Sequence, residues 1–369
     1  MKIVIDCRFW GPKYTGLGRY TQSLVKAIYK IKPNHQFYLI INLRNKKNIQ
    51  KAVPKFNLIP CSAKPYSISE QFQLPKILSN LKPDLVHFTH FNVPLFFKGK
   101  FIVTIHDLIK HHSTGSATTT KSLFEYSFKR LGYRLIIKHA VNNSHLILTP
   151  SQWVKKDIIN FYKISAKKII ITPEAAADVY SQQQKFKTST SKLKTPYLIF
   201  VGNTYPHKNI PQLIKAVQQI NLTTKLKLII ITARDIFYQR LRNEIRKLNA
   251  QSVIKIKGFV SDKQLKSFYY HSLAFITPSL LEGFGLPGIE AMASGTIVLS
   301  SDKSALSEVY GQSAIYFNPR SLKDMVKKID KVINFSSSAR QQLINQAQKH
   351  AQKYSWQNTA EKTLNAYQS

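Results

Sequence analysis

The stretch LAFITPSLLEGFGLPGIEAMASGTIVLSS, residues 273–301, carries the clearest indication of the fold in this sequence. Two short apolar runs, LAFITPS and TIVLSS, flank a glycine-containing loop and a short helical segment, PGIEAMAS. Pro287 suits the first turn of a helix, and Gly295 suits the position just after its end. A strand, a helix and a second strand in this order form the βαβ unit of a parallel sheet.

The same alternation recurs along the whole chain. A first set of apolar runs comprises KIVIDC, QFYLII, LVHF, FIVTIHD, LILTPS and KIIITP, and a second comprises PYLIFVG, LKLIIITA, VIKIKGF, LAFITPS, TIVLSS and AIYFNP. Between the sets, residues 181–195 are polar and poor in large apolar side chains, as in a linker. We therefore expect an α/β protein of two doubly wound Rossmann-like domains, residues 1–180 and 196–350, facing a cleft. Residues 351–369 are expected to form a C-terminal helix that packs back toward the first domain.

Length and composition agree with two packed domains. The chain has 369 residues, of which 43% are hydrophobic. Two cysteines, Cys7 and Cys61, with no spacing pattern argue against a disulfide framework or a cysteine-ligated zinc site. No apolar run reaches about 18 residues, and charge appears at Asp6 and Arg8, too early for a secretory signal. These features predict a cytoplasmic protein.

The chain is strongly basic, with 55 Lys and Arg against 18 Asp and Glu and a net charge of +37. Such a field attracts polyanions, and an anionic membrane surface is one candidate partner. No helix-turn-helix, zinc or aromatic RNP-type pattern accompanies the charge, so we expect no specific nucleic-acid partner. The lysines are scattered over the chain, and a compositional bias or a non-catalytic polyanion-binding protein remains an alternative.

The glycine loop permits a different reading, because Gly283, Gly285 and Gly288 spell the G-x-G-x-x-G of dinucleotide-binding proteins. Asp302 supplies the acid expected about 20 residues further on. An NAD-dependent oxidoreductase is therefore an alternative. The short helix, Pro278 at the strand exit and the charge of Glu282 beside a pyrophosphate count against it.

A nucleotide sugar fits these residues better. Gly283 and Gly285 allow the backbone to approach a ligand, and a helix that starts near Pro287 directs its positive end at phosphates. Glu282 precedes that helix and Glu290 falls in its first turn, so two carboxylates could accept hydrogen bonds from hydroxyls at either end of one ligand. Alternatively, Glu290 is an acid favoured by the helix dipole and Glu282 is solvated.

The segment PSLLEGFGLPGIEAMASGTIVLSSDKSALSEV resembles the donor-site signature of GT-B glycosyltransferases of family 4, whose E-x7-E pair corresponds to Glu282 and Glu290. The likeness extends to GFVSDKQLKSFYYHSLAFITPS, VGNTYPHKNI, TGLGRYTQSLVKAI and YSWQNTAEKTLNAYQ, in the order typical of that family. The resemblance implies a retaining glycosyltransferase that moves a hexose, with mannose one candidate, from a GDP- or UDP-linked sugar. The acceptor would be a glycan or lipid-linked molecule in cell-envelope or polysaccharide synthesis.

The resemblance also implies roles for individual residues. Glu290 would bind the ribose, Glu282 the transferred sugar, and Lys208 the diphosphate. His106 would lie near the transferred sugar, and the glycine loop of the first domain would close over the diphosphate. Catalytic roles therefore fall to His106, Lys208 and Glu282, and donor-binding roles to Gly16, Gly18, Asn203, Gly258, Val260, Gly283, Phe284, Gly285, Leu286 and Glu290.

Several of these residues have a structural alternative. His106 and Asp107 could be a satisfied polar pair, and Gly16 and Gly18 could simply form a turn. His87 and His90 are interpreted as structural. Asn203 stands where the family often has an arginine, so neutralisation of the phosphates would depend more on Lys208.

No cofactor or metal is expected. A lysine and oriented backbone amides can stabilise the charge that develops on a leaving diphosphate. The sequence has neither a D-x-D pair nor histidines at metal-ligand spacing.

No motif in the sequence assigns residues to the acceptor site. In KSLFEYSFKRLGYRLIIKHA, Arg130, Arg134 and Lys138 follow one another at i+4 spacing beside the apolar stripe Phe124, Phe128, Leu131 and Leu135. This pattern is typical of a helix at a membrane surface, and a peripheral location on the inner face of the membrane is consistent with it. A core helix with a solvated basic face explains the same pattern.

Overall fold

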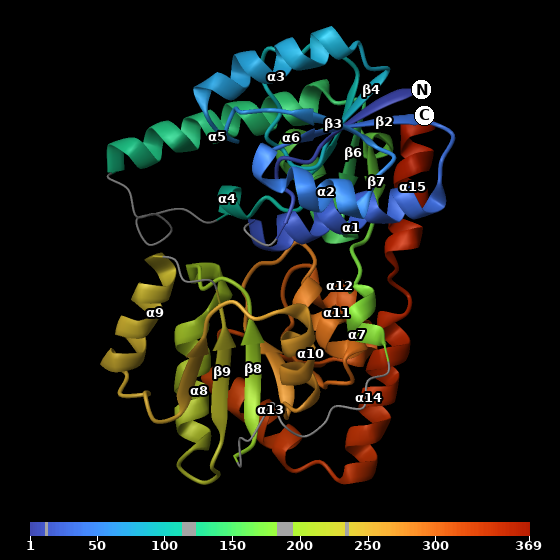
Figure 1. The fold of residues 1–369 in the computed structure, drawn as a ribbon. Coiled ribbons are helices and arrows are strands. Elements are labelled where there is room, and N and C mark those ends of the chain that lie inside the picture. The colour runs from blue at the N-terminus through green and yellow to red at the C-terminus, as the bar shows by residue number, and fades with distance from the viewer. Residues whose placement is uncertain (12–13, 113–122, 183–194, 233–235) are drawn as a thin grey trace. The chain divides into compact units, whose positions relative to one another are not determined.

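The computed structural model describes residues 1–11, 14–112, 123–182, 195–232 and 236–369. They form two compact units (Figure 1), each described by itself below. The first holds Met1–Leu108, 123–174 and Trp356–Ser369, and the second holds 109–112 and Ala175–Ser355 in its described part. Residues 183–194 of the expected linker lie outside the described residues.

The first unit is built on a parallel sheet of seven strands in the order β3-β2-β1-β4-β5-β6-β7. The order reverses between β1 and β4, which makes the sheet doubly wound. Its strands are β1 (Lys2–Asp6), β2 (Gln36–Ile41), β3 (Asn57–Pro60), β4 (Leu85–Phe88), β5 (Phe101–Thr104), β6 (Leu146–Thr149) and β7 (Ile169–Ile171). Its helices are α1 (Thr15–Ile31), η2 (Leu43–Asn45), α2 (Lys46–Ala52), α3 (Ile68–Leu81), α5 (Leu123–Asn143), α6 (Gln152–Tyr162), η4 (Ala166–Lys168) and α15 (Trp356–Gln368).

Alternation along β1 explains why helices cover both faces of this sheet. Ile3 and Ile5 point into a core shared with α1 and the C-terminal helix α15. Val4 points the other way, into a core shared with α3, α5 and α6. Successive side chains of a strand face opposite sides, so an uninterrupted apolar run requires a layer on each side.

The second unit repeats the plan with six parallel strands in the order β10-β9-β8-β11-β12-β13. They are β8 (Tyr197–Val201), β9 (Lys227–Ile231), β10 (Ile254–Lys257), β11 (Ala274–Thr277), β12 (Val298–Ser301) and β13 (Ile315–Phe317). The described helices are α4 (Ile109–His112), α7 (Asp178–Ser181), η5 (Pro206–Lys208), α8 (Ile210–Ile220), α9 (Ile236–Lys247), α10 (Asp262–Tyr270), α11 (Leu286–Ala293), α12 (Leu306–Tyr310), η6 (Gly311–Ser313), α13 (Leu322–Ile333) and α14 (Ser337–Ala351). The expected fold class, two doubly wound Rossmann-like α/β domains, is confirmed.

The segment that begins the second unit is held there by Tyr180. This residue is fully buried, its ring meets that of Tyr269 at 6.2 Å, and its hydroxyl donates to Asp262 Oδ1 over 3.3 Å. At the other end of the chain, α15 packs against α1 in the first unit.

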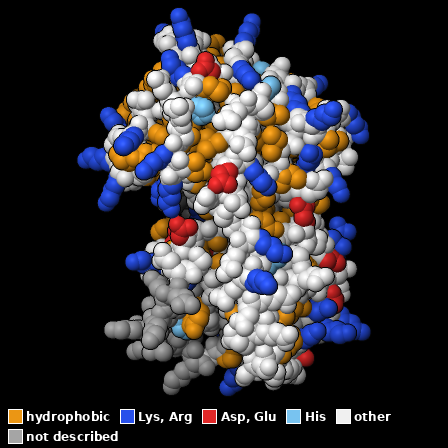
Figure 2. Space-filling model, turned by 90° about the vertical axis from the view of Figure 1, so that its right-hand side faces the viewer, with side chains coloured by type: hydrophobic (Ala, Val, Ile, Leu, Met, Phe, Trp, Pro, Cys, Tyr) orange, Lys and Arg blue, Asp and Glu red, His pale blue; other side chains and the backbone are white. Residues whose placement is uncertain are grey.

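The surface reflects the composition. Lys and Arg side chains are spread over the face shown in Figure 2, with few acidic side chains among them. In the described part of the chain, none of the helices combines the length and the apolar character that a membrane-spanning segment requires.

Candidate active site

The site residues of the second unit lie where its strand order reverses. Strand β8 has β9 on one side and β11 on the other. The chain therefore continues from the carboxyl ends of β8 and β11 in opposite directions along the sheet. Ligands of doubly wound sheets bind at such a point. The Leu280 amide donates to the His207 carbonyl over 2.8 Å and ties the two loops together. Lys208 ends the short helix η5 in the first loop, and Glu282 lies in the second.

Lys208 and Glu282 form a direct ion pair. Lys208 Nζ lies 2.5 Å from Glu282 Oε1, and the two side chains are only 14% and 15% exposed. Ser279 Oγ donates to the same carboxylate oxygen over 2.7 Å, and the Glu282 amide donates to Ser304 Oγ over 2.9 Å. The sequence suggested separate tasks for the lysine and the glutamate, and the structure brings them together.

These neighbours decide the protonation of the pair. Burial raises the pKa of Glu282, but the charges of Lys208 and His207 and the hydrogen bonds from Lys208 and Ser279 outweigh it, so the pKa is lowered. Burial and the charge of Lys208 lower the pKa of His207 to about 4. At neutral pH, the site therefore holds the Glu282 carboxylate beside a neutral His207 imidazole.

The glycine loop turns sharply before α11. Gly285 has φ +93° and precedes the helix, and its carbonyl accepts a 2.6 Å hydrogen bond from the hydroxyl of buried Tyr310. A Cβ at Gly285 would lie 2.4 Å from the Tyr310 oxygen, and one at Gly288 would lie 2.3 Å from the same ring. Close packing against Tyr310 thus explains why glycine is required at positions 285 and 288. The sequence had suggested a different reason for Gly285, namely that its backbone can approach a ligand. Among the residues that the structure describes, no side chain caps α11, so its positive end can bind an anionic group.

Glu290 lies further along α11 than the sequence suggested. The helix begins at Leu286, and its first turn contains no acid, so the expectation that Glu290 lies in the first turn is wrong. The residue is 3% exposed, and the Tyr269 hydroxyl donates to its Oε2 over 3.4 Å. The carboxylate of Glu290 is therefore held by α10, and it is less exposed than that of Glu282.

Two further predicted segments lie at the same edge of the sheet. Asn203 follows β8 and is half-buried. Gly258 and Val260 follow the edge strand β10, and Phe259 between them is 77% exposed. Phe284 is buried and meets Tyr354 edge-to-face at 5.5 Å, so its side chain packs inside while its amide remains in the loop.

In the first unit, Gly16 and Gly18 lie at the start of α1. A Cβ at Gly18 would lie 1.9 Å from the Gly11 carbonyl oxygen, so the helix could not approach the loop after β1 with any other residue there. A Cβ at Gly16 would meet none of the described residues within 4 Å. Gly18 thus has a packing role, whereas the described residues impose no such requirement at Gly16.

His106 follows β5 in the first unit, and both of its ring nitrogens face acceptors. Nδ1 lies 3.0 Å from Glu174 Oε1, and Nε2 lies 3.1 Å from the Thr89 carbonyl oxygen. Burial lowers the pKa of His106, but the hydrogen bond and charge of Glu174 and the Thr89 carbonyl outweigh it, so the pKa is raised. The histidine predicted to lie near the sugar is therefore also held by its own neighbours.

His87 is a core residue. It is fully buried, and its nitrogens lie 2.7 Å from the Tyr367 hydroxyl and 2.8 Å from Thr104 Oγ1. Burial, with a contribution from His106, lowers its pKa to about 3.

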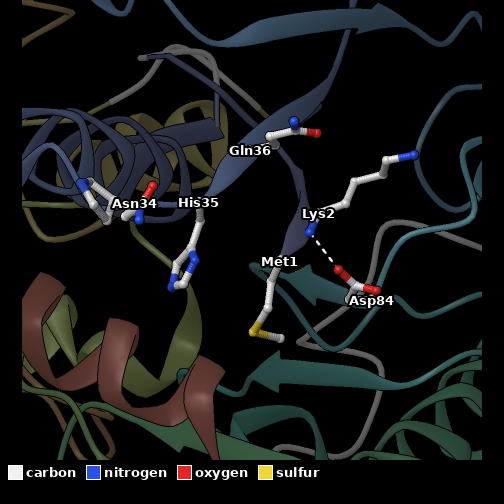
Figure 3. A pocket seen from close by; sticks show the side chains of 7 residues that line it. Met1, Lys2, Asn34, His35, Gln36 and Asp84 are labelled. Atoms are coloured by element: carbon white, nitrogen blue, oxygen red, sulfur yellow. Dashed lines mark hydrogen bonds between the residues drawn. The ribbon is translucent and has the colours of Figure 1, made fainter.

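A pocket of the first unit lies at the amino ends of its strands, away from the predicted site residues (Figure 3). It is lined by Met1, Lys2, Pro33, Asn34, His35, Gln36 and Asp84, and the Lys2 amide donates to Asp84 across it. These residues lie at the amino ends of β1 and β2 or just before β4, whereas sheets of this type bind ligands at the carboxyl ends.

Ser279, Ser304 and Tyr310 shape the site and were not predicted. Ser279 could have been noticed, because only Pro278 separates it from the end of the strand LAFIT. No local pattern marks Ser304 or Tyr310, which reach the loop from 22 and 25 residues further along the chain.

Two doubly wound units, one of which carries Lys208, Glu282 and Glu290 around the start of α11, fit a glycosyltransferase of the GT-B class. The family model described as "Glycosyltransferase Family 4" matches residues 14–175, and the model described as "Glycosyl transferases group 1" matches residues 181–350. The chain belongs to this family of glycosyltransferases.

Individual relatives agree with this assignment. The O-antigen chain mannosyltransferase RfbU of Salmonella typhimurium is 30% identical over 251 residues, covering 67% of this chain and 65% of that protein. The O-antigen chain mannosyltransferase B of Escherichia coli is 25% identical, covering 100% of this chain and 99% of that protein. The solved structure of Anabaena Alr3699/HepE in complex with UDP-glucose has a TM-score of 0.75 at 15% identity, with 100% and 99% of the chains covered. That structure supports the fold.

Proposed function

We propose that this enzyme transfers a hexose, with mannose favoured, from a nucleotide-diphosphate sugar to a growing glycan or lipid-linked acceptor in cell-envelope polysaccharide synthesis. The names of the two relatives, both O-antigen chain mannosyltransferases, support mannose and the acceptor class. The complex of the similar structure with UDP-glucose supports a nucleotide sugar as the donor.

The Lys208–Glu282 ion pair beside the open end of α11 is the observation that carries this proposal. A diphosphate at the helix end would attract Lys208 and draw it from Glu282. The carboxylate would then be available to hydroxyls of the sugar. Donor binding would thus exchange one ion pair for two ligand contacts, so that Lys208 and Glu282 act together.

The reaction that we infer retains the anomeric configuration and needs no metal ion. As the bond between sugar and diphosphate breaks, negative charge grows on the departing phosphate, where Lys208 and the amides at the start of α11 would stabilise it. Among the described residues, no three His, Cys, Asp or Glu side chains are grouped so that they could hold a metal ion.

A panel of nucleotide sugars tests the donor. Ligands that bind only the folded state raise the melting temperature, so GDP-mannose or a UDP-sugar should do so, and NAD(H) should not. Stabilisation by NAD(H) alone would contradict the proposal. NMR of the product formed with a soluble acceptor analogue would then report whether the anomeric configuration is retained.

Transfer should also persist in excess EDTA, because Lys208 and the helix amides take the place of a cation. The measurement is product formation before and after chelation. Loss of activity with EDTA and its recovery with Mg²⁺ or Mn²⁺ would refute metal independence.

A further inference from the structure

Seven large apolar side chains are exposed in three segments of the first unit. Those in α3 are Ile68 (81% exposed) and Phe72 (63%), and those in the loop after β4 are Leu95 (38%) and Phe96 (58%). In α5 they are Phe128 (74%), Leu131 (56%) and Leu135 (51%). We call this set the α3–α5 surface. Exposed apolar residues that stand singly are normal, but a group of this size needs an explanation.

Printed contacts connect the three segments. The Phe72 and Phe96 rings lie 5.2 Å apart, and the Leu95 amide donates to Gln71 Oε1 over 2.8 Å, so the loop rests on α3. On the other side, the Pro94 carbonyl lies beside His139 of α5. Figure 1 shows α3 and α5 running along the same side of the first unit. The exposed side chains therefore belong to one surface.

The exposed residues of α5 are not its core face. Ile137, Ala140 and Val141 are buried in the core that α5 shares with α3. Phe128, Leu131 and Leu135 follow a stripe of i, i+3 and i+7 positions on another side of the helix. The stripe predicted from the sequence is therefore solvent-facing where its side chains are described, and the alternative of a core stripe is excluded there. The side chain of Phe124 lies outside the described residues.

The surface is surrounded by positive charge. Lys76 of α3, Lys98 of the loop, and Lys129, Arg134 and Lys138 of α5 are all exposed. Within residues 68–81, 94–100 and 127–143 the single acid is Glu70, which is fully buried and paired with Arg8 at 2.5 Å. The exposed part of these segments therefore carries positive charge only.

We propose that the α3–α5 surface binds the interface of an anionic lipid bilayer, with its apolar side chains among the acyl chains and its lysines and arginines at the head groups. Binding of this kind grows with the apolar area buried and with the number of Lys and Arg side chains near an anionic surface. A second copy of this chain would bring the same positive residues face to face, and the repulsion opposes such a dimer. Vesicle binding needs no sugar transfer, so the inference stands independently of the proposed reaction.

The test is co-sedimentation of the full chain with vesicles of phosphatidylcholine mixed with phosphatidylglycerol, or of phosphatidylcholine alone. We expect binding to the mixed vesicles and little to the neutral ones. The double substitution Leu131→Ser and Leu135→Ser, or Phe72→Ser and Phe96→Ser, should weaken partitioning roughly 10-fold through lost apolar burial. The matched control is Leu222→Ser in the second unit, where Leu222 is 83% exposed, and it should bind as the unchanged protein does.

A comparison of two double substitutions tests whether binding depends on the charges of this surface or on the overall positive charge of the chain. Arg134→Gln with Lys138→Gln should weaken binding, whereas Lys323→Gln with Lys327→Gln, exposed at the same i+4 spacing on α13, should not. Equal loss in both pairs, or full binding by the apolar variants, would overturn the proposal. So would a dimer in sedimentation velocity that the Leu131/Leu135 variant abolishes without any change in vesicle binding.

The nucleotide-sugar melting shift, measured on the same variants, keeps the two proposals apart. It should be unchanged in every α3–α5 variant, since these residues lie outside the donor site. Absence of any shift would count against the proposed function and leave the vesicle result unaffected.

Discussion

At the scale of single residues, the site depends on charges that balance one another. Glu282 is largely buried, and burial alone would raise its pKa, but Lys208, His207 and Ser279 reverse that effect. The carboxylate is thus ionised because its neighbours are in place. A change at either member of the pair should therefore affect both binding and folding.

Lys208→Ala should lower turnover by roughly 10²- to 10³-fold, the scale for removal of one preorganised electrostatic donor. Since Asn203 stands where the family often has an arginine, little compensation is available. The variant also leaves Glu282 without its cation, which should destabilise the second unit by about 1–3 kcal/mol. Steady-state kinetics and thermal unfolding measure the two effects.

The control for this prediction is Lys215→Ala, which removes an exposed lysine of α8. It should change neither turnover nor melting temperature appreciably. Near-normal turnover of Lys208→Ala at saturating donor would show that the diphosphate is neutralised by another group.

Substitution of the two glutamates, Glu282 and Glu290, should affect ligand binding differently. Glu290→Gln should weaken binding of free UDP or GDP and of the nucleotide sugar alike, because Glu290 is expected to hold the ribose. Glu282→Gln releases Lys208 toward the diphosphate, so it should keep or strengthen nucleotide binding and weaken only the nucleotide sugar. Titration calorimetry with both ligands tests this division, and an equal loss of free nucleotide in both variants would disprove it.

At the scale of elements, the sequence predicted strands and helices well because their signals are local. Pro287 lies in the first turn of α11, and Gly295, just beyond its end, has φ +80°, as the pattern indicated. Glu290 falls just beyond the first turn, because Gly285 in a left-handed conformation starts the helix at Leu286, one residue earlier than expected. The sequence could not predict that Gly285 and Gly288 make room for a buried tyrosine, because Tyr310 lies 25 residues after Gly285 and no local pattern marks the contact.

The packing of Tyr310 against α11 yields a stability prediction. Gly288→Ala would place a methyl group 2.3 Å from the buried Tyr310 ring, and such overpacking should destabilise the protein by about 1–3 kcal/mol. Gly132 in α5 is a suitable control, because a Cβ there would meet no atom of the described residues within 4 Å. Gly132→Ala should stabilise the protein by roughly 0.5–1 kcal/mol. Denaturant unfolding of both variants gives the comparison, and destabilisation by both would contradict the geometric explanation.

At the scale of the whole molecule, the first unit contains buried His87 and half-buried His106, and the second contains half-buried His207, with pKa values moved in different directions. The pKa of His207 is lowered to about 4 and that of His87 to about 3, and burial is the main cause in both. The pKa of His106 is raised, because Glu174 and the Thr89 carbonyl outweigh its burial. Each shift links folding to pH.

The signs of these shifts give opposite pH dependences. An unfolded histidine has a pKa of about 6.5, so below that pH the unfolded chain binds protons at His87 and His207 that the folded chain refuses. The free energy of unfolding should therefore fall as the pH decreases from about 6.5 toward 4. His106 acts in reverse: its contribution is complete below its unfolded pKa and is lost as the pH rises through its higher folded value.

Stability should consequently decline on both sides of a maximum near pH 6.5, and single variants should remove each side separately. His207→Gln should flatten the acidic decline of the second unit, and His106→Gln should flatten the alkaline decline of the first. Because two units can unfold in separate transitions, calorimetry between pH 4 and pH 8, which resolves them, is the suitable measurement. An acidic decline that is identical in His207→Gln and the unchanged protein would show that other groups, such as carboxylates paired in the folded state, control it.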